Sequence, residues 1–78
     1  MIDRLNNALA PTDIQLASVL EKPYRLRVGF SQNGQSAVLD FLFNGTPKWT
    51  RVEEVGGAGT SRGLLAKIQG LLNVEASP

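Results

Sequence analysis

The sequence predicts an α+β fold in which three antiparallel strands and two helices follow the order α-β-β-β-α. Two observations carry this prediction. Apolar and polar residues alternate with period two over residues 24–30 and 37–43, and apolar residues recur at helical spacing towards both ends of the chain. Burying the apolar sheet face and both helical stripes together requires a two-layer sandwich with both helices on one face. A chain of 78 residues holds one domain, covering 1–78.

The first helix is expected over residues 12–22. Thr12 and Gln15 have the Thr-x-x-Gln spacing of a capping box, in which each side chain bonds to the backbone N–H of the other residue. Apolar residues at 16, 19 and 20 then fall on one helical face. Pro23 ends the helix, because a proline disfavours helical geometry in the residue before it.

Two further helical segments and a tail complete the ends of the chain. Residues 1–10 are expected to form a short helix or arm, since apolar residues recur at 2, 5 and 9. The last helix runs from a cap at Thr60 or Ser61 to about residue 73. Its apolar stripe consists of Leu64, Leu65, Ile68, Leu71 and Leu72. Residues 74–78 are expected to form a frayed tail.

The three strands are separated by two turns. Asn33-Gly34 predicts the first turn because both residues tolerate positive φ, and residues 44–47 form the second. The third strand, 48–55, has no cleanly apolar face, so either a bulge shifts its register or Trp49 stays partly exposed. The first two strands share an apolar face made of Tyr24, Leu26, Val28, Phe30, Leu39, Phe41 and Phe43.

The available side chains argue against catalysis and against metal binding. The chain has no histidine and no cysteine, so the usual zinc ligands, a cysteine nucleophile and a histidine base are missing. Glu53 and Glu54 are adjacent carboxylates, but neighbours on a strand point to opposite faces. We therefore expect a binding module that is not an enzyme and requires neither a cofactor nor a metal.

Composition also bears on location and partners. No segment approaches the roughly 20 apolar residues that a membrane span needs, and the N-terminus does not resemble a signal peptide. We therefore expect no membrane partner, and the lack of cysteine favours a cytoplasmic location. The net charge of +1 gives little general attraction to nucleic acid and little repulsion between copies of the chain.

A glycine-rich turn at 56–63 joins the third strand to the last helix. Backbone N–H groups and the helix dipole can meet an anion at such a junction. The alternative is a flexible connection whose glycines let the chain turn sharply. The spacing fits neither a Walker A loop nor the dinucleotide-binding fingerprint, and both interpretations stay open.

The segment Gly57-Ala58-Gly59-Thr60-Ser61-Arg62, followed by Ala66-Lys67 and Leu71-Leu72, resembles the double-stranded-RNA-binding domain. The α-β-β-β-α order is also similar to that family. The resemblance implies duplex RNA as a partner. The phosphate contacts it implies are Ser61, Arg62 and Lys67. The minor-groove contacts it implies are Gln15 on the first helix and Gln32, Asn33 and Gly34 in the first hairpin loop.

The other face of the sheet supports an alternative function. Arginines there alternate with Asp40 across the strands and lie beside aliphatic residues, a mixture that suits a protein interface. The alternative is a small regulatory or adaptor protein that binds a partner protein, or that forms a homodimer through the open sheet face or its edge strand. The candidate interface residues are Arg25, Arg27, Val38, Leu42, Trp49 and Arg51.

Overall fold

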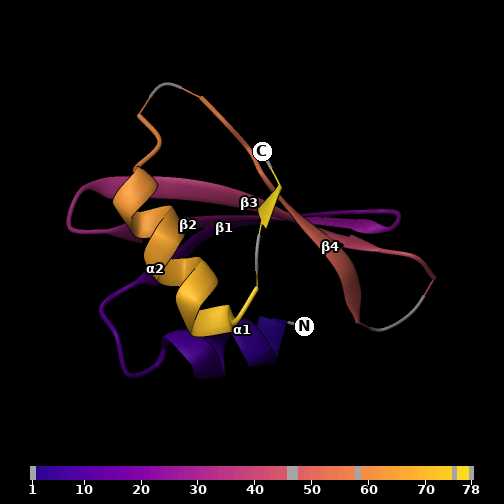
Figure 1. Cartoon of the computed structure of the whole chain (residues 1–78). Helices are drawn as coiled ribbons and strands as arrows, with labels where there is room; N and C mark the ends of the chain where they lie inside the picture. Colours follow the sequence, from indigo (N-terminus) through magenta and orange to yellow (C-terminus); the bar gives the residue numbers. More distant parts are fainter. Residues whose placement is uncertain (1, 46–47, 58, 75, 78) are drawn as a thin grey trace.

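The computed structural model describes residues 2–45, 48–57, 59–74 and 76–77. It shows an α+β fold in which two helices lie on one side of an antiparallel four-stranded sheet, with a short fifth strand at one edge (Figure 1). The strand order is β1-β2-β3-β4-β5, and β5 alone runs parallel to its neighbour β4. The elements are α1 (Ile2–Leu9), β1 (Gln15–Lys22), β2 (Arg25–Gln32), β3 (Gln35–Phe43), β4 (Trp49–Glu54), α2 (Arg62–Leu72) and β5 (Ala76–Ser77).

The core lies between the helices and the two central strands. In the β2–β3 register Leu26 faces Phe41 and Val28 faces Leu39, so apolar side chains pair across the strands on the helix side. Both helices turn apolar residues onto this surface, so the prediction of two helices on one face is correct in part, with α1 in place of the helix expected at 12–22. The buried helix residues are Leu5, Leu9, Leu64, Leu65, Ile68 and Leu72.

The helix predicted over 12–22 is wrong, and β1 occupies that segment. Thr12 does not begin a helix: its hydroxyl donates to the Leu9 carbonyl (2.8 Å) and accepts from the Ile14 N–H (3.2 Å), closing the end of α1. β1 is an edge strand on which no residue is buried, so the alternation that identifies a half-buried strand is missing. The predicted three-stranded sheet therefore has four antiparallel strands.

The two hairpin turns around β2 both use left-handed residues. Asn33 (φ 50°) and Gly34 (φ 80°) connect β2 to β3 and confirm the predicted turn. Pro23 and Tyr24 connect β1 to β2, and Tyr24 has φ 61°, which is unusual for a bulky residue. Tyr24 was expected on the apolar face, but its position in the turn leaves it 68% exposed.

A bulge settles the register of β4. Leu42 pairs with Arg51 and Phe43 with Trp49, so Thr50 is an extra residue on β4. This shift turns Trp49 towards the helices, where its ring meets the Phe41 ring edge-on at 5.3 Å. The Arg4 guanidinium of α1 lies 4.1 Å from the centre of the Trp49 ring. Trp49 therefore packs against the core and is not part of the opposite sheet face.

In the C-terminal part, the predicted cap of α2 is confirmed and the tail differs from the prediction. Ser61 caps α2 as expected, its side-chain oxygen accepting from the Leu64 N–H at 3.2 Å, and Asn73 ends the helix with φ 56°. The tail at 74–78, expected to fray, instead contains β5. Val52 pairs with Ala76 there, while residues 75 and 78 lie outside the described part of the chain.

Truncation of the core side of α2 should cost far more than truncation of its outer side. Ile68 is fully buried, so Ile68→Ala is expected to lower the free energy of unfolding by about 2–5 kcal/mol. Leu71 is 40% exposed on the same helix, and Leu71→Ala should cost less than about 1 kcal/mol. Urea denaturation of the two variants measures the difference, and equal losses would contradict the packing described here.

Candidate functional site

The sheet face opposite the helices is uncovered within the described residues (Figure 1). The strand register places two rows of side chains on it. We call this surface, together with Val38 of β3, the open face. The first row, from β1 to β4, is Leu20, Arg27, Asp40 and Glu53. The second row is Lys22, Arg25, Leu42 and Arg51.

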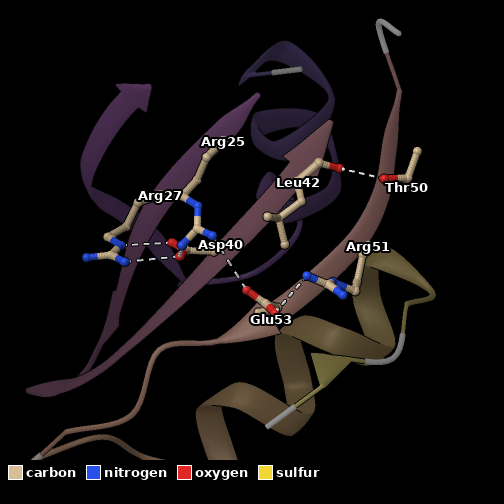
Figure 2. Close-up of polar contacts among 7 residues, drawn as sticks. All are labelled: Arg25, Arg27, Asp40, Leu42, Thr50, Arg51 and Glu53. Atoms are coloured by element: carbon tan, nitrogen blue, oxygen red, sulfur yellow. Dashed lines mark hydrogen bonds and ion pairs between the residues drawn. The ribbon is translucent and has the colours of Figure 1, made fainter. Parts of the chain in front are cut away.

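Asp40 is the centre of the open face (Figure 2). Arg27 binds it in fork geometry, with Nε 2.8 Å from Oδ1 and Nη2 3.0 Å from Oδ2. Arg25 adds a third hydrogen bond from Nη1 to Oδ2 at 2.7 Å. The two guanidiniums cover the carboxylate, so only 3% of the Asp40 side chain is exposed although it lies on an uncovered face.

These contacts fix the protonation of Asp40. The hydrogen bonds from Arg27 are the main cause that holds the pKa of the Asp40 carboxyl below its usual range. Burial opposes this shift, and the charges of Arg27 and Arg25 act with the hydrogen bonds to lower the pKa. The same contacts raise the pKa of Arg27. The carboxylate is therefore ionised at neutral pH and orients both guanidiniums.

Glu53 extends the network to the far strand. Its carboxylate lies 3.1 Å from Arg51 Nη2 and 3.9 Å from Arg25 Nη2 (Figure 2). Arg51 is 60% exposed, the most open of the arginines on this surface. The open face carries four cationic and two anionic side chains, so its balance is positive. Leu20, Val38 and Leu42 place apolar groups between the charges.

The residues implied as RNA contacts lie outside the two rows of the open face. Lys67 Nζ contacts Gln32 Oε1 at 3.4 Å, and the Gln32 and Asn33 amides donate to Asp13. The Gln32 hydrogen bond is the main cause of the lowered pKa of Asp13. Lys67 belongs to α2, so this polar cluster lies beside that helix. Gly34 belongs to the same hairpin turn.

The other implied contacts bond to groups within the chain or lie on a different element than expected. Ser61 uses its oxygen to cap α2, and Arg62 Nη1 lies 2.6 Å from Glu54 Oε1. Gln15 is the first residue of β1, so it cannot present itself from a helix. In the glycine-rich turn the Ser61 N–H donates to the Ser36 carbonyl at 2.9 Å. Residue 58 of that turn lies outside the described residues.

Metal and membrane sites were also sought in the described parts of the chain. No group of three or more Asp, Glu, His or Cys residues there could hold a metal ion. None of the described helices is long and apolar enough to cross a membrane.

The open face was predicted only in part from the sequence. Arg25, Arg27, Asp40 and Arg51 were expected in one cross-strand group, and the register brings these four together. Leu20 and Lys22 were missed because their segment was assigned to a helix. No Asn-Gly or Asp-Gly pair marks the turn at Pro23-Tyr24, so the sequence carries no clear hairpin signal for this strand.

Comparison with known proteins identifies a family. Residues 1–72 match the family described as the TATA-binding-like protein domain of the TOTE conflict systems. Searches of curated proteins and of solved structures gave no match. The family match overturns the resemblance to the double-stranded-RNA-binding domain. The element order that formed part of this resemblance included a helix at 12–22 that is in fact a strand.

The lowered pKa of Asp40 predicts how stability depends on pH. A carboxyl whose folded pKa is depressed stabilises the fold above its unfolded pKa of about 3.9, and this stabilisation is lost as the pH falls through the folded pKa. Asp40→Asn should cost about 1–2 kcal/mol at neutral pH, a figure reduced because both arginines are partly exposed to solvent.

The measurement is the denaturation midpoint of each protein between neutral pH and about pH 2. Asp40→Asn should flatten the acid decline, whereas Glu21→Gln on exposed β1 should leave it intact. A parallel decline in the wild type and in Asp40→Asn would show that this carboxylate does not govern acid stability.

Proposed function

Because the chain belongs to the TATA-binding-like protein domains of the TOTE conflict systems, we propose that it binds duplex DNA through the open face of its sheet. The action is binding without catalysis. The observation that carries the proposal is a sheet face free of helices on which oriented arginines alternate with aliphatic side chains. Neither a metal nor a cofactor enters the proposal, since the chain has no histidine and no cysteine.

A β-sheet is a known reader of the minor groove. The TATA-binding protein lays strands against that groove, and proteins of this kind use cations to contact it and apolar wedges to unstack base steps. The open face has both kinds of group: Arg25, Arg27 and Arg51 supply positive charge, and Leu20 and Leu42 supply exposed or half-buried apolar surface.

Asp40 prepares two of the arginines for a ligand. Arg27 uses Nε and Nη2 for the carboxylate, which leaves the donors on Nη1 for a phosphate or a base edge. Because the guanidinium is already held, binding costs less side-chain entropy than it would for a free arginine. Arg51 contributes a more exposed charge, since 60% of its side chain is open to solvent beside its ion pair with Glu53.

The small number of cations limits the expected affinity. Four cationic side chains, two of them bonded to Asp40, can neutralise only a few phosphates. The logarithm of the binding constant should therefore fall with the logarithm of salt concentration at a slope of about −2 to −4. A cytoplasmic location is compatible with this role and remains a prediction.

Charge removal on the open face should weaken DNA binding, while the same change on the helix side should not. Arg51→Gln is expected to lower affinity for a short A·T-rich duplex and to reduce the salt slope by about one. Arg62→Gln removes the same charge from α2, where Arg62 is 79% exposed, and is the matched control. Fluorescence anisotropy titrations at several salt concentrations measure both.

Three further duplexes make the assay specific. A G·C-rich DNA duplex tests groove preference, a duplex RNA of the same sequence tests the type of nucleic acid, and a scrambled A·T-rich duplex tests sequence dependence. Equal losses from Arg51→Gln and Arg62→Gln, or an absence of binding at low salt, would contradict DNA recognition by the open face.

A further inference from the structure

Asp40 places a negative charge at the middle of the face to which DNA binding is assigned (Figure 2). Only 3% of its side chain is exposed, whereas Arg25 and Arg27 beside it are 37% and 40% exposed. The carboxylate lowers the positive charge that the open face offers to phosphates. A surface that worked by charge alone would gain from a neutral residue here, so the acidic group calls for another explanation.

The carboxylate occupies the arginine donors that match a phosphate best. Arg27 directs Nε and Nη2 at Asp40, so the fork that fits a carboxylate or a phosphate is already in use. Arg25 directs Nη1 at the same carboxylate, and its Nη2 lies 3.9 Å from Glu53. A backbone phosphate can take the Arg27 fork only by displacing Asp40, which is unfavourable because a buried carboxylate then loses its partner.

The remaining donors of the two arginines are held in place. The bonds to Asp40 use two of the five N–H donors of Arg27, and Nη1 takes no part in them. In the register Arg27 lies between Leu20 and Asp40, and Arg25 pairs with Leu42, so aliphatic side chains flank both guanidiniums. Donors held in this way bond only to acceptors that the ligand brings to their positions.

We propose that Asp40 is a specificity-determining residue, which withholds Arg25 and Arg27 from backbone phosphates and presents their remaining donors to base edges in the groove. The inference rests on the proposed binding of DNA by the open face. In the minor groove A·T pairs show only acceptors, whereas a G·C pair adds the amino donor of guanine. The held N–H groups therefore distinguish the two kinds of base pair, while phosphates carry no sequence information.

A charge-matched pair of variants tests this role. Asp40→Asn and Glu53→Gln each remove one negative charge from the open face, so each should steepen the salt slope by about 0.9. Only Asp40→Asn frees the Arg27 fork, so it alone should lower the ratio of affinities for A·T-rich over G·C-rich duplexes at least about fivefold. Glu53→Gln frees Arg51, which is already 60% exposed, and should change this ratio less than about twofold.

A second variant keeps the charge and removes the fork. Arg27→Lys retains a cation beside Asp40, but an ammonium is a point charge without planar donors. Its salt slope should equal that of the wild type, while the A·T over G·C ratio falls at least about fivefold. Because the lysine can still pair with Asp40, this variant also decides the matter if Asp40→Asn does not fold. Fluorescence anisotropy with short duplexes of both compositions gives the ratios and slopes.

The restraint on the arginines has a readout that needs no DNA. In the free chain the Arg27 Nε–H should exchange with solvent at least about tenfold slower than the Arg51 Nε–H, because Asp40 accepts a hydrogen bond from it. Asp40→Asn should remove most of this difference. Nuclear magnetic resonance of ¹⁵N-labelled arginine side chains measures both rates, and equal exchange in the wild-type chain would overturn the restraint.

The outcomes separate this inference from the proposed function. If DNA binding depends on Arg51 but the wild-type chain does not distinguish the two duplexes, Asp40 has no role in specificity and DNA binding stands. The same conclusion follows if Asp40→Asn and Glu53→Gln lower the ratio equally, or if Asp40→Asn weakens binding to both duplexes by one factor. An absence of binding to every duplex at low salt would overturn DNA binding, and the role of Asp40 with it.

Discussion

The strand β3 joins the two sides of this domain, since three consecutive residues in it are buried in opposite directions. Leu39 and Phe41 point into the core beneath the helices, and Asp40 points to the open face. If only the helix side of β3 were buried, the Asp40 side chain would be exposed to water. Here the guanidiniums of Arg25 and Arg27 enclose it, so the position of the core fixes the position of the charged network.

Burying a carboxylate at the surface of a small sheet has a cost that its partners must offset. An ionised group removed from water is unfavourable unless it is paired and hydrogen-bonded. Asp40 receives three hydrogen bonds from two arginines, and within the described residues no buried side-chain nitrogen or oxygen lacks a partner. The result is an arginine pair whose orientation is set by Asp40, on a face that also carries Leu20, Val38 and Leu42.

The sequence predicted the elements in which apolar side chains face the core and polar side chains face water. β2, β3 and α2 were located because Val28, Leu39 and Ile68 belong to strict apolar patterns that burial requires. The segment 12–22 was assigned wrongly because an exposed edge strand has no such pattern, and residues 16, 19 and 20 match helical spacing by coincidence. Only backbone pairing with β2 identifies this strand, and pairing leaves little trace in one sequence.

The candidate site, like the fold, was predicted only in part. The grouping of Arg25, Arg27 and Asp40 followed from strand parity and agrees with the register. Trp49 could not be placed, because its side depends on the bulge at Thr50, and a single extra residue reverses every side chain beyond it. The RNA resemblance depended on element order, so it failed together with the helix at 12–22.

The short strand β5 leaves the two edges of the sheet unequal. It covers part of the β4 edge, where Val52 and Glu53 pair with Ala76 and Ser77, whereas no strand of the described chain follows β1. An uncovered strand edge exposes backbone N–H and C=O groups that can pair with another strand. In the described chain, the two residues of β5 therefore shield part of one edge and leave β1 as the longer uncovered strand.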